Sequence, residues 1–223
     1  MKKLLIYSLL FIGSTVNALA QKDAQAKVIL NAVSQKYHAY NIVKSDFTFT
    51  IDDKQNNAQQ TQDGTLIVQA KTNKFKLTIY AEGSKTAVQQ EIISDGKSQW
   101  TYIPKDKEVQ LNNVDNSDSG FNPAQMFTIY EKGYKYIYTG TIMAKGKAYQ
   151  VIDLTPEKSK EYFKIRLMID KIKKQIYSAQ IFDNNGSRYL YTINNVTPNV
   201  PVSENVFTYD AKSHPGIEVV DLR

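Results

Sequence analysis

The sequence of 223 residues contains no cysteine and carries a formal net charge of +6. The lack of cysteine excludes disulfides, thiolate catalysis, cysteine metal sites and a lipid anchor attached through cysteine. The length and the 42% content of hydrophobic residues allow one domain with a sizeable core.

The N-terminus has the pattern of an export signal. Met1-Lys2-Lys3 precede an apolar run from Leu4 to Ile12, and small residues end at Ala18-Leu19-Ala20. The apolar run is too short to span a bilayer, so we expect a signal peptide over 1–20 and one exported domain over 21–223. Cleavage after Ala20 leaves 26 basic and 22 acidic residues, a net charge of +4.

The mature chain opens with a predicted amphipathic helix over about residues 24–40. Apolar side chains recur there at helical spacing, at Val28, Ile29, Ala32, Val33 and Tyr37. From residue 46 the apolar period changes to two, which indicates strands over 46–51, 64–68 and 75–79.

A β-hairpin is predicted between Ile92 and Pro104. Asp95-Gly96 is a strong turn signal, because glycine adopts positive φ and aspartate tolerates it. The return strand alternates through Trp100 and Tyr102. A short strand at 109–111 and a polar loop over 112–120 follow.

A second short helix is predicted from Phe121-Asn122-Pro123, because proline is accepted in the first helical turn. It carries Met126, Phe127, Ile129 and Tyr130. Further strands are predicted over 134–142, 148–155, 162–169, 176–183 and 188–195, and a final extended segment starts at Val206.

These elements predict a mainly β (α+β) fold built on a single antiparallel sheet of about eleven strands. Open twisted sheets of roughly ten or more strands curl, close or split. We therefore expect an incomplete β-barrel, with the amphipathic helices as a lid over a hydrophobic cavity.

The hairpin carries a resemblance to a known family. Ser94-Asp95-Gly96-Lys97, followed by Trp100, Tyr102 and Pro104, resembles the hairpin of the periplasmic outer-membrane lipoprotein carrier proteins, the LolA-like family. The order of helix, hairpin, second helix and strands is similar to that family over essentially the whole mature chain. The resemblance implies a periplasmic chaperone, not an enzyme, that needs no cofactor or metal.

The resemblance also implies partners. The family accepts the acyl chains of lipoproteins from an inner-membrane lipoprotein exporter, encloses them in a hydrophobic cavity and passes them to an outer-membrane acceptor. We expect a monomer, and export argues against binding to nucleic acid.

Site residues are expected on the apolar strand faces and on the two helices, and the resemblance places Phe75 near the cavity mouth. The expected lipid-binding residues are Leu66, Val68, Phe75, Leu77, Ile79, Ile92 and Trp100. The expected lid residues are Val28, Ile29, Val33, Tyr37, Met126, Phe127 and Ile129. For each lining residue the alternative is a purely structural place in the core.

One loop departs from the family pattern. The family carries a Lys-Arg-Pro loop shortly before the position of Phe75, and its arginine hydrogen-bonds the lid shut. This chain has Gln69-Ala70-Lys71-Thr72-Asn73-Lys74 instead. Lys71 is the candidate latch, but it lacks the planar fork of arginine, so apolar contacts are expected to govern the lid.

Other functions stay open at this point. A half-barrel envelope domain also suits another lipid or a membrane regulatory protein, as in related stress-sensor domains. A glycosidase would need a pair of carboxylates, for which Asp153, Glu157 and Glu161 are the candidates. The sequence brings two of them together only if a particular fold is assumed. His38 and His214 lack a metal-ligand partner at a recognised spacing and are expected at the surface.

Overall fold

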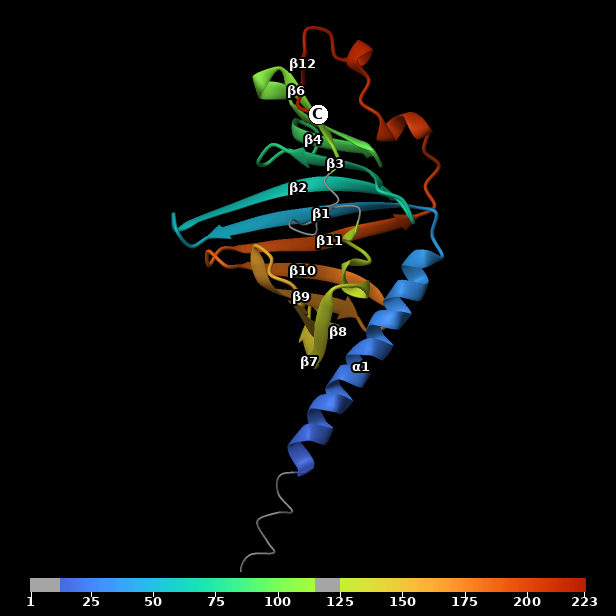
Figure 1. Ribbon diagram of the computed structural model, residues 1–223, viewed down its shortest axis with the longest axis vertical. Coiled ribbons are helices and arrows are strands. Elements are labelled where there is room, and N and C mark those ends of the chain that lie inside the picture. Colours follow the sequence, from blue (N-terminus) through green and yellow to red (C-terminus); the bar gives the residue numbers. More distant parts are fainter. Residues whose placement is uncertain (1–12, 115–124) are drawn as a thin grey trace, which may run out of the picture.

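The computed structural model describes residues 13–114 and 125–223, and one large sheet dominates this part of the chain (Figure 1). Its twelve strands follow the order β12-β6-β5-β4-β3-β2-β1-β11-β10-β9-β8-β7. The strands are β1 (Ile42–Asp53), β2 (Ala58–Gln69), β3 (Lys74–Tyr80), β4 (Val88–Asp95), β5 (Ser98–Ile103), β6 (Glu108–Asn113), β7 (Tyr134–Ala144), β8 (Lys147–Pro156), β9 (Tyr162–Asp170), β10 (Gln175–Asp183), β11 (Arg188–Pro198) and β12 (Glu218–Asp221).

The predicted fold class is confirmed, with one strand more than expected. The additional strand is β12, which pairs in parallel with β6, whereas the other neighbours are antiparallel. The segment around Val206 is not extended as expected. It forms the 3-10 helix η4 (Glu204–Phe207), and η5 (Ala211–Ser213) follows before β12.

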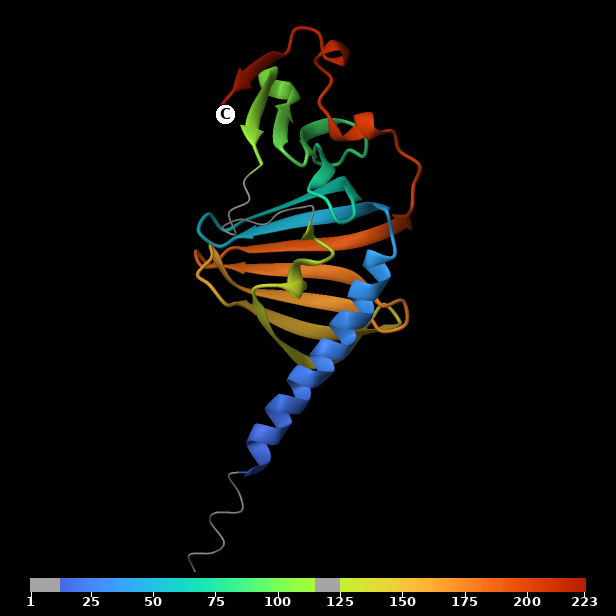
Figure 2. The same ribbon diagram turned by 45° about the vertical axis from the view of Figure 1, so that its right-hand side comes forward.

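The helix α1 (Gly13–His38) runs diagonally across one face of the sheet, where it contacts β7 and β10 (Figures 1 and 2). It begins before the expected start near residue 24 and passes through the expected cleavage site. Among the described residues, no helix combines the length and the apolar character needed to cross a bilayer.

The buried stripe of α1 is shifted relative to the predicted one. Its buried side chains recur at helical spacing and are Ala26, Ile29, Leu30, Val33 and Tyr37. Val28 was expected on this stripe but is 70% exposed, because it lies on the helix face turned away from the sheet.

The second predicted helix is not formed as expected in the described residues. In the described part of the segment, Gln125 is in 3-10 conformation, residues 126–128 form turns, and η3 (Ile129–Glu131) is a 3-10 helix, so no α-helix forms there. The expected start at Phe121-Asn122-Pro123, and most of the polar loop over 112–120, lie outside the described residues. The apolar side chains of this segment are nevertheless buried at Met126, Phe127, Ile129 and Tyr130.

The predicted hairpin is confirmed as β4 and β5. Gly96 has a φ of +92°, and the Asp95 carboxylate accepts hydrogen bonds from the backbone N–H groups of Lys97 and Ser98, each at 2.8 Å. The turn chemistry expected from Asp95-Gly96 therefore sets the register of the two strands.

The sheet carries hydrophobic side chains on both faces. Leu77 pairs with Ile92, and Ile92 with Thr101, so these residues share the face covered by α1, here called the inner face. Ile93 pairs with Trp100, and Trp100 with Leu111, so these three share the opposite, outer face. Side chains alternate between the two faces along each strand.

The C-terminal segment covers the outer face at one end of the sheet. The helix η4 contacts β3 and β4, and the ring of Tyr209 lies 6.0 Å from that of Tyr102. Phe207 is only 1% exposed. The chain therefore has a main core under α1 and a smaller apolar cluster under its C-terminal segment.

Candidate functional site

Six of the seven expected lining residues come together on the inner face. Leu66, Val68, Phe75 and Leu77 belong to the main buried core, and Ile79 and Ile92 pack against it. The pairings place Val68 opposite Phe75, Leu66 opposite Leu77 and Leu77 opposite Ile92.

Trp100 is the exception among the expected lining residues. It lies on the outer face, away from Leu77, and is not part of the core beneath α1. The alternation in β5 places Trp100 and Tyr102 on a common face but does not say which face the lid covers. Trp100 is therefore removed from the candidate lining.

The inner face is closed in this structure. Leu66 is fully buried and Phe75 is 2% exposed, and Ile152, Leu154 and Leu167 on the opposite wall are also fully buried. Phe75, expected near a cavity mouth, thus lies within a filled core. Side chains of α1 and of the segment before β7 occupy the space in which a cavity was expected.

Two elements, here together called the lid, cover the inner face. The helix α1 contributes Ile29, Val33 and Tyr37, and the segment 125–131 contributes Met126, Phe127 and Ile129, all of them buried. The rings of Tyr37 and Phe127 stack with centroids 4.5 Å apart at an interplanar angle of 24°. The two lid elements therefore hold each other through aromatic contact as well as through the core.

A polar contact also joins the two lid elements. His38 Nε2 lies 2.8 Å from Glu131 Oε1, and the hydroxyl of Ser34 donates to the same oxygen at 2.5 Å. The side chains of His38 and Glu131 are 45% and 27% exposed. A contact of this exposure is weak and easily broken.

The sequence predicts only a surface position for His38 and gives no sign of its contact with Glu131. His38 and Glu131 are 93 residues apart. No motif or spacing links them, since the contact exists only because α1 and η3 meet on the inner face.

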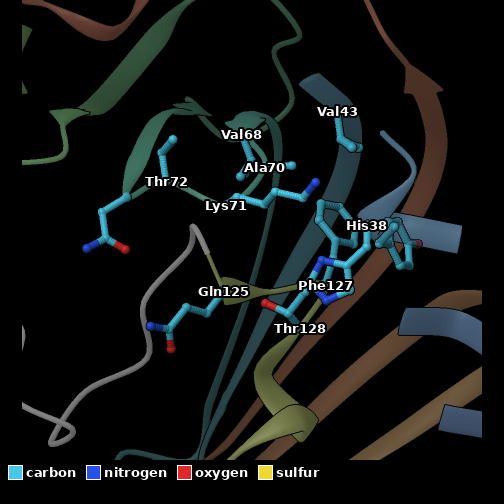
Figure 3. A pocket seen from close by; sticks show the side chains of 11 residues that line it. His38, Val43, Val68, Ala70, Lys71, Thr72, Gln125, Phe127 and Thr128 are labelled. Carbon is cyan, nitrogen blue, oxygen red and sulfur yellow. The ribbon is translucent and has the colours of Figure 1, made fainter. Parts of the chain in front are cut away.

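A pocket of about 290 Å³ opens at the edge of the lid (Figure 3). Ligand pockets span about 300–1,000 Å³, so this one lies near the lower limit. It combines expected lining, lid and latch residues with side chains that were not expected there. Its lining is Tyr37, His38, Val43, Val68, Ala70, Lys71, Thr72, Asn73, Gln125, Phe127 and Thr128.

Lys71, the candidate latch, is among the residues that line this pocket. Figure 3 shows its side chain extending over the pocket toward the side formed by His38. Lys71 is exposed and makes no hydrogen bond or ion pair with any residue that the structure describes. Within the described part of the chain, the polar contacts that join the two lid elements are those of His38 and Ser34 with Glu131.

Two phenol groups lie under the lid. Burial raises the pKa of Tyr37, and burial together with the nearby Glu131 charge raises the pKa of Tyr130, so both stay neutral near pH 7. No residue in the described ranges gives the Tyr130 hydroxyl a hydrogen bond. The site is therefore an apolar, uncharged interior closed by weak contacts.

Comparison with known proteins agrees with this architecture. The family model described as "Outer membrane lipoprotein carrier protein LolA" matches residues 38–210. The outer-membrane lipoprotein carrier protein of Pasteurella multocida is 22% identical over 86% of each chain, and that of Haemophilus influenzae is 25% identical over 82% of each chain.

A solved structure shares the fold. It is an uncharacterized conserved protein from Thermus thermophilus, which superposes with a TM-score of 0.59 at 11% identity and covers 88% of this chain and 99% of its own. The match to the family model extends over more than half of the chain. The chain thus belongs to the LolA family of outer-membrane lipoprotein carriers, non-enzymatic transport proteins of the periplasm.

Proposed function

We propose that the mature protein, residues 21–223, binds the acyl chains of lipoproteins beneath the lid and carries them through the periplasm. It receives them from an inner-membrane exporter and passes them to an outer-membrane acceptor. The observation that carries the proposal is the continuous apolar inner face from Leu66 to Ile92, held under a lid of two separate elements.

The energetics favour a lid that refolds onto the empty site. Burial of an acyl chain gains about 0.8 kcal/mol per methylene, so a protein that only buried its cargo would not release it. Here Ile29, Val33 and Phe127 fill the inner face when cargo is absent. Cargo must displace these contacts. When cargo leaves, the contacts form again, and their free energy offsets part of the burial free energy that is lost with the acyl chains.

The pocket suggests where opening begins. Phe127 stacks on Tyr37 at the pocket, and Val68 lies on its far side. Val68 is paired with Phe75. Separation of Phe127 from Tyr37 would therefore extend the pocket from Val68 toward Phe75 and the rest of the lining.

A reversible lock on the lid tests the proposal. The chain has no cysteine, so Ser34→Cys combined with Glu131→Cys supplies only two thiols, one on each lid element. A short reducible bis-thiosulfonate reagent would join them. We expect the locked protein to take up no purified acylated lipoprotein in native mass spectrometry, and uptake to return after reduction.

The two single-cysteine variants, treated with the same reagent, are the controls. Equal uptake by the locked and the reduced protein would contradict cargo binding beneath the lid. Uptake of free phospholipid without uptake of lipoprotein would favour the alternative of a lipid carrier. Stoichiometric binding of a membrane regulatory protein, without uptake of either ligand, would favour a sensor.

A further inference from the structure

Two neighbouring turns form a basic surface that the carrier function does not explain. The turn between β7 and β8 carries Lys145 and Lys147, and the turn between β9 and β10 carries Lys171, Lys173 and Lys174. The backbone N–H of Lys171 donates to the carbonyl of Ala148 at 3.0 Å, so the turns lie side by side. Figure 2 shows them next to α1.

No acidic side chain balances these five lysines within the two turns. Asp170 is 8% exposed, and its carboxylate accepts the backbone N–H groups of Ile172 and Lys173 at 2.9 and 2.8 Å. No ion pair joins any of the five to a described residue. Their charge is therefore available to a partner.

An apolar side chain projects from the middle of this surface. Ile172 is 89% exposed between Lys171 and Lys173, and Met143, beside the other turn, is 70% exposed. The turn that presents Ile172 is held by Asp170 and by Lys36 of α1, whose ammonium donates to the carbonyl of Lys173 at 2.6 Å. Ile172 is thus held out toward solvent by a braced turn.

The opposite ends of the strands differ in charge. The turn from β1 to β2 has Asp52 and Asp53 beside Lys54, and the turn from β8 to β9 has Glu157 and Glu161 among its lysines. The positive charge is therefore concentrated at one end of the sheet. The pocket lies at this same end, since the turn from β2 to β3 forms part of its lining.

We propose that the basic surface formed by Lys145, Lys147, Lys171, Lys173 and Lys174, together with Ile172, docks the protein on an anionic lipid bilayer. Lysine point charges attract anionic headgroups, and an exposed apolar side chain among them inserts at the interface. A lipid surface fits better than an acidic protein, because Ile172 projects from the surface and does not line a groove that a protein segment could fill.

The consequence for transport rests on the proposed function. Docking in this orientation brings the pocket end of the sheet toward the bilayer, where acyl chains leave or enter. Docking itself requires no cargo. The two proposals can therefore fail separately.

Sedimentation with lipid vesicles tests docking on the cargo-free mature protein. We expect binding to vesicles of phosphatidylcholine mixed with phosphatidylglycerol, and much weaker binding to phosphatidylcholine alone. The triple variant K171Q/K173Q/K174Q should lower the affinity roughly 100-fold at low salt, because each lysine near an anionic surface contributes about fivefold. Ile172→Ser should weaken binding severalfold without a change in charge.

The variant K54Q/K85Q/K158Q is the matched control. It removes three positive charges from turns at the other end of the strands and should bind vesicles almost as well as the wild type. Equal losses in the two triple variants would show that only net charge matters and would overturn the proposal. Equal binding to neutral and anionic vesicles would overturn it as well.

A measurement of cargo uptake distinguishes a failure of the docking proposal from a failure of the carrier function. The K171Q/K173Q/K174Q variant should load lipoprotein as the wild type does. If the wild-type protein binds anionic vesicles but does not load cargo, the docking proposal stands and the carrier proposal is rejected. If the wild type does not bind anionic vesicles, the lipid proposal is rejected. If the triple variant then also loses binding to an acidic envelope protein, the basic surface binds a protein instead.

Discussion

The imidazole of His38 and the carboxylate of Glu131 meet at 2.8 Å and join the end of α1 to the 3-10 helix η3. The two residues come from the two elements that cover the inner face. Ser34 adds a second hydrogen bond to the same carboxylate oxygen. Glu131 is therefore the polar residue on which both lid contacts depend.

Glu131→Ala should loosen the lid without unfolding the protein. A partly exposed polar contact contributes about 0.2–1 kcal/mol, so loss of the His38 and Ser34 contacts together should cost the closed form at most about 2 kcal/mol. We expect lipoprotein uptake to become severalfold faster in stopped-flow measurements with a fluorescent acyl label. Glu157→Ala, in an exposed turn, is the control and should leave the rate unchanged. Equal uptake rates in the wild type and in Glu131→Ala would show that the contact does not restrain the lid.

Tyr130→Phe should stabilise the closed protein. A buried polar group without a hydrogen bond costs about 1–3 kcal/mol, and no described residue pairs with this hydroxyl. Urea denaturation should show a gain of about 1 kcal/mol, and cargo uptake should slow. Tyr134→Phe is the control, because its hydroxyl lies 2.5 Å from that of Tyr162 and its loss should destabilise. A loss of stability in Tyr130→Phe would indicate that the hydroxyl has a partner.

Trp100→Ala should lower stability but leave cargo uptake intact, since Trp100 lies on the outer face. The loss should stay below the about 3–5 kcal/mol of a fully buried aromatic side chain, because Trp100 is only partly buried. Leu77→Ala, on the inner face, should reduce both stability and uptake. Denaturation and native mass spectrometry together check this difference. A specific loss of uptake in Trp100→Ala would return this residue to the lining.

Gly64→Ala should destabilise the core. A Cβ atom at this position would clash with the ring of Phe47 and lie 2.8 Å from the carbonyl oxygen of Thr78. Overpacking of this kind costs about 1–3 kcal/mol. Gln60→Ala, at an exposed position of the same strand, serves as the control in thermal denaturation. Wild-type stability in Gly64→Ala would show that Phe47 moves aside without cost.

The ion pair of Lys74 and Glu204 ties η4 to β3 and should make the C-terminal segment sensitive to acid. The Lys74 ammonium donates to the Glu204 carboxylate at 2.8 Å and lowers the pKa of Glu204. The tie is therefore present above the ordinary pKa of glutamate and is lost as pH falls through the lowered value. Lys74→Met should raise the pKa of Glu204 in an NMR titration. Identical titration curves in the wild type and in Lys74→Met would show that the pair does not form in solution.

Local patterns predicted much of this protein. Alternation along the strands, the Asp95-Gly96 turn and the helical period of α1 indicated a mainly β fold with an apolar face and a covering helix. These features depend on neighbouring residues, because a strand alternates with period two and a turn needs particular backbone angles. The hairpin from Ser94 to Pro104 resembles that of the LolA-like family, and the match to the family model confirmed this relationship.

Only the tertiary structure decided which surfaces meet. The sequence established that Trp100 and Tyr102 share a face, but packing placed that face under the C-terminal segment and away from α1. In the same way, the packing of α1 on the sheet buries Leu30, leaves Val28 exposed and places His38 next to Glu131. The periodicity of side chains along a strand or helix is set by the local backbone conformation. The residue that a side chain contacts across an interface is set by how elements distant in the sequence pack.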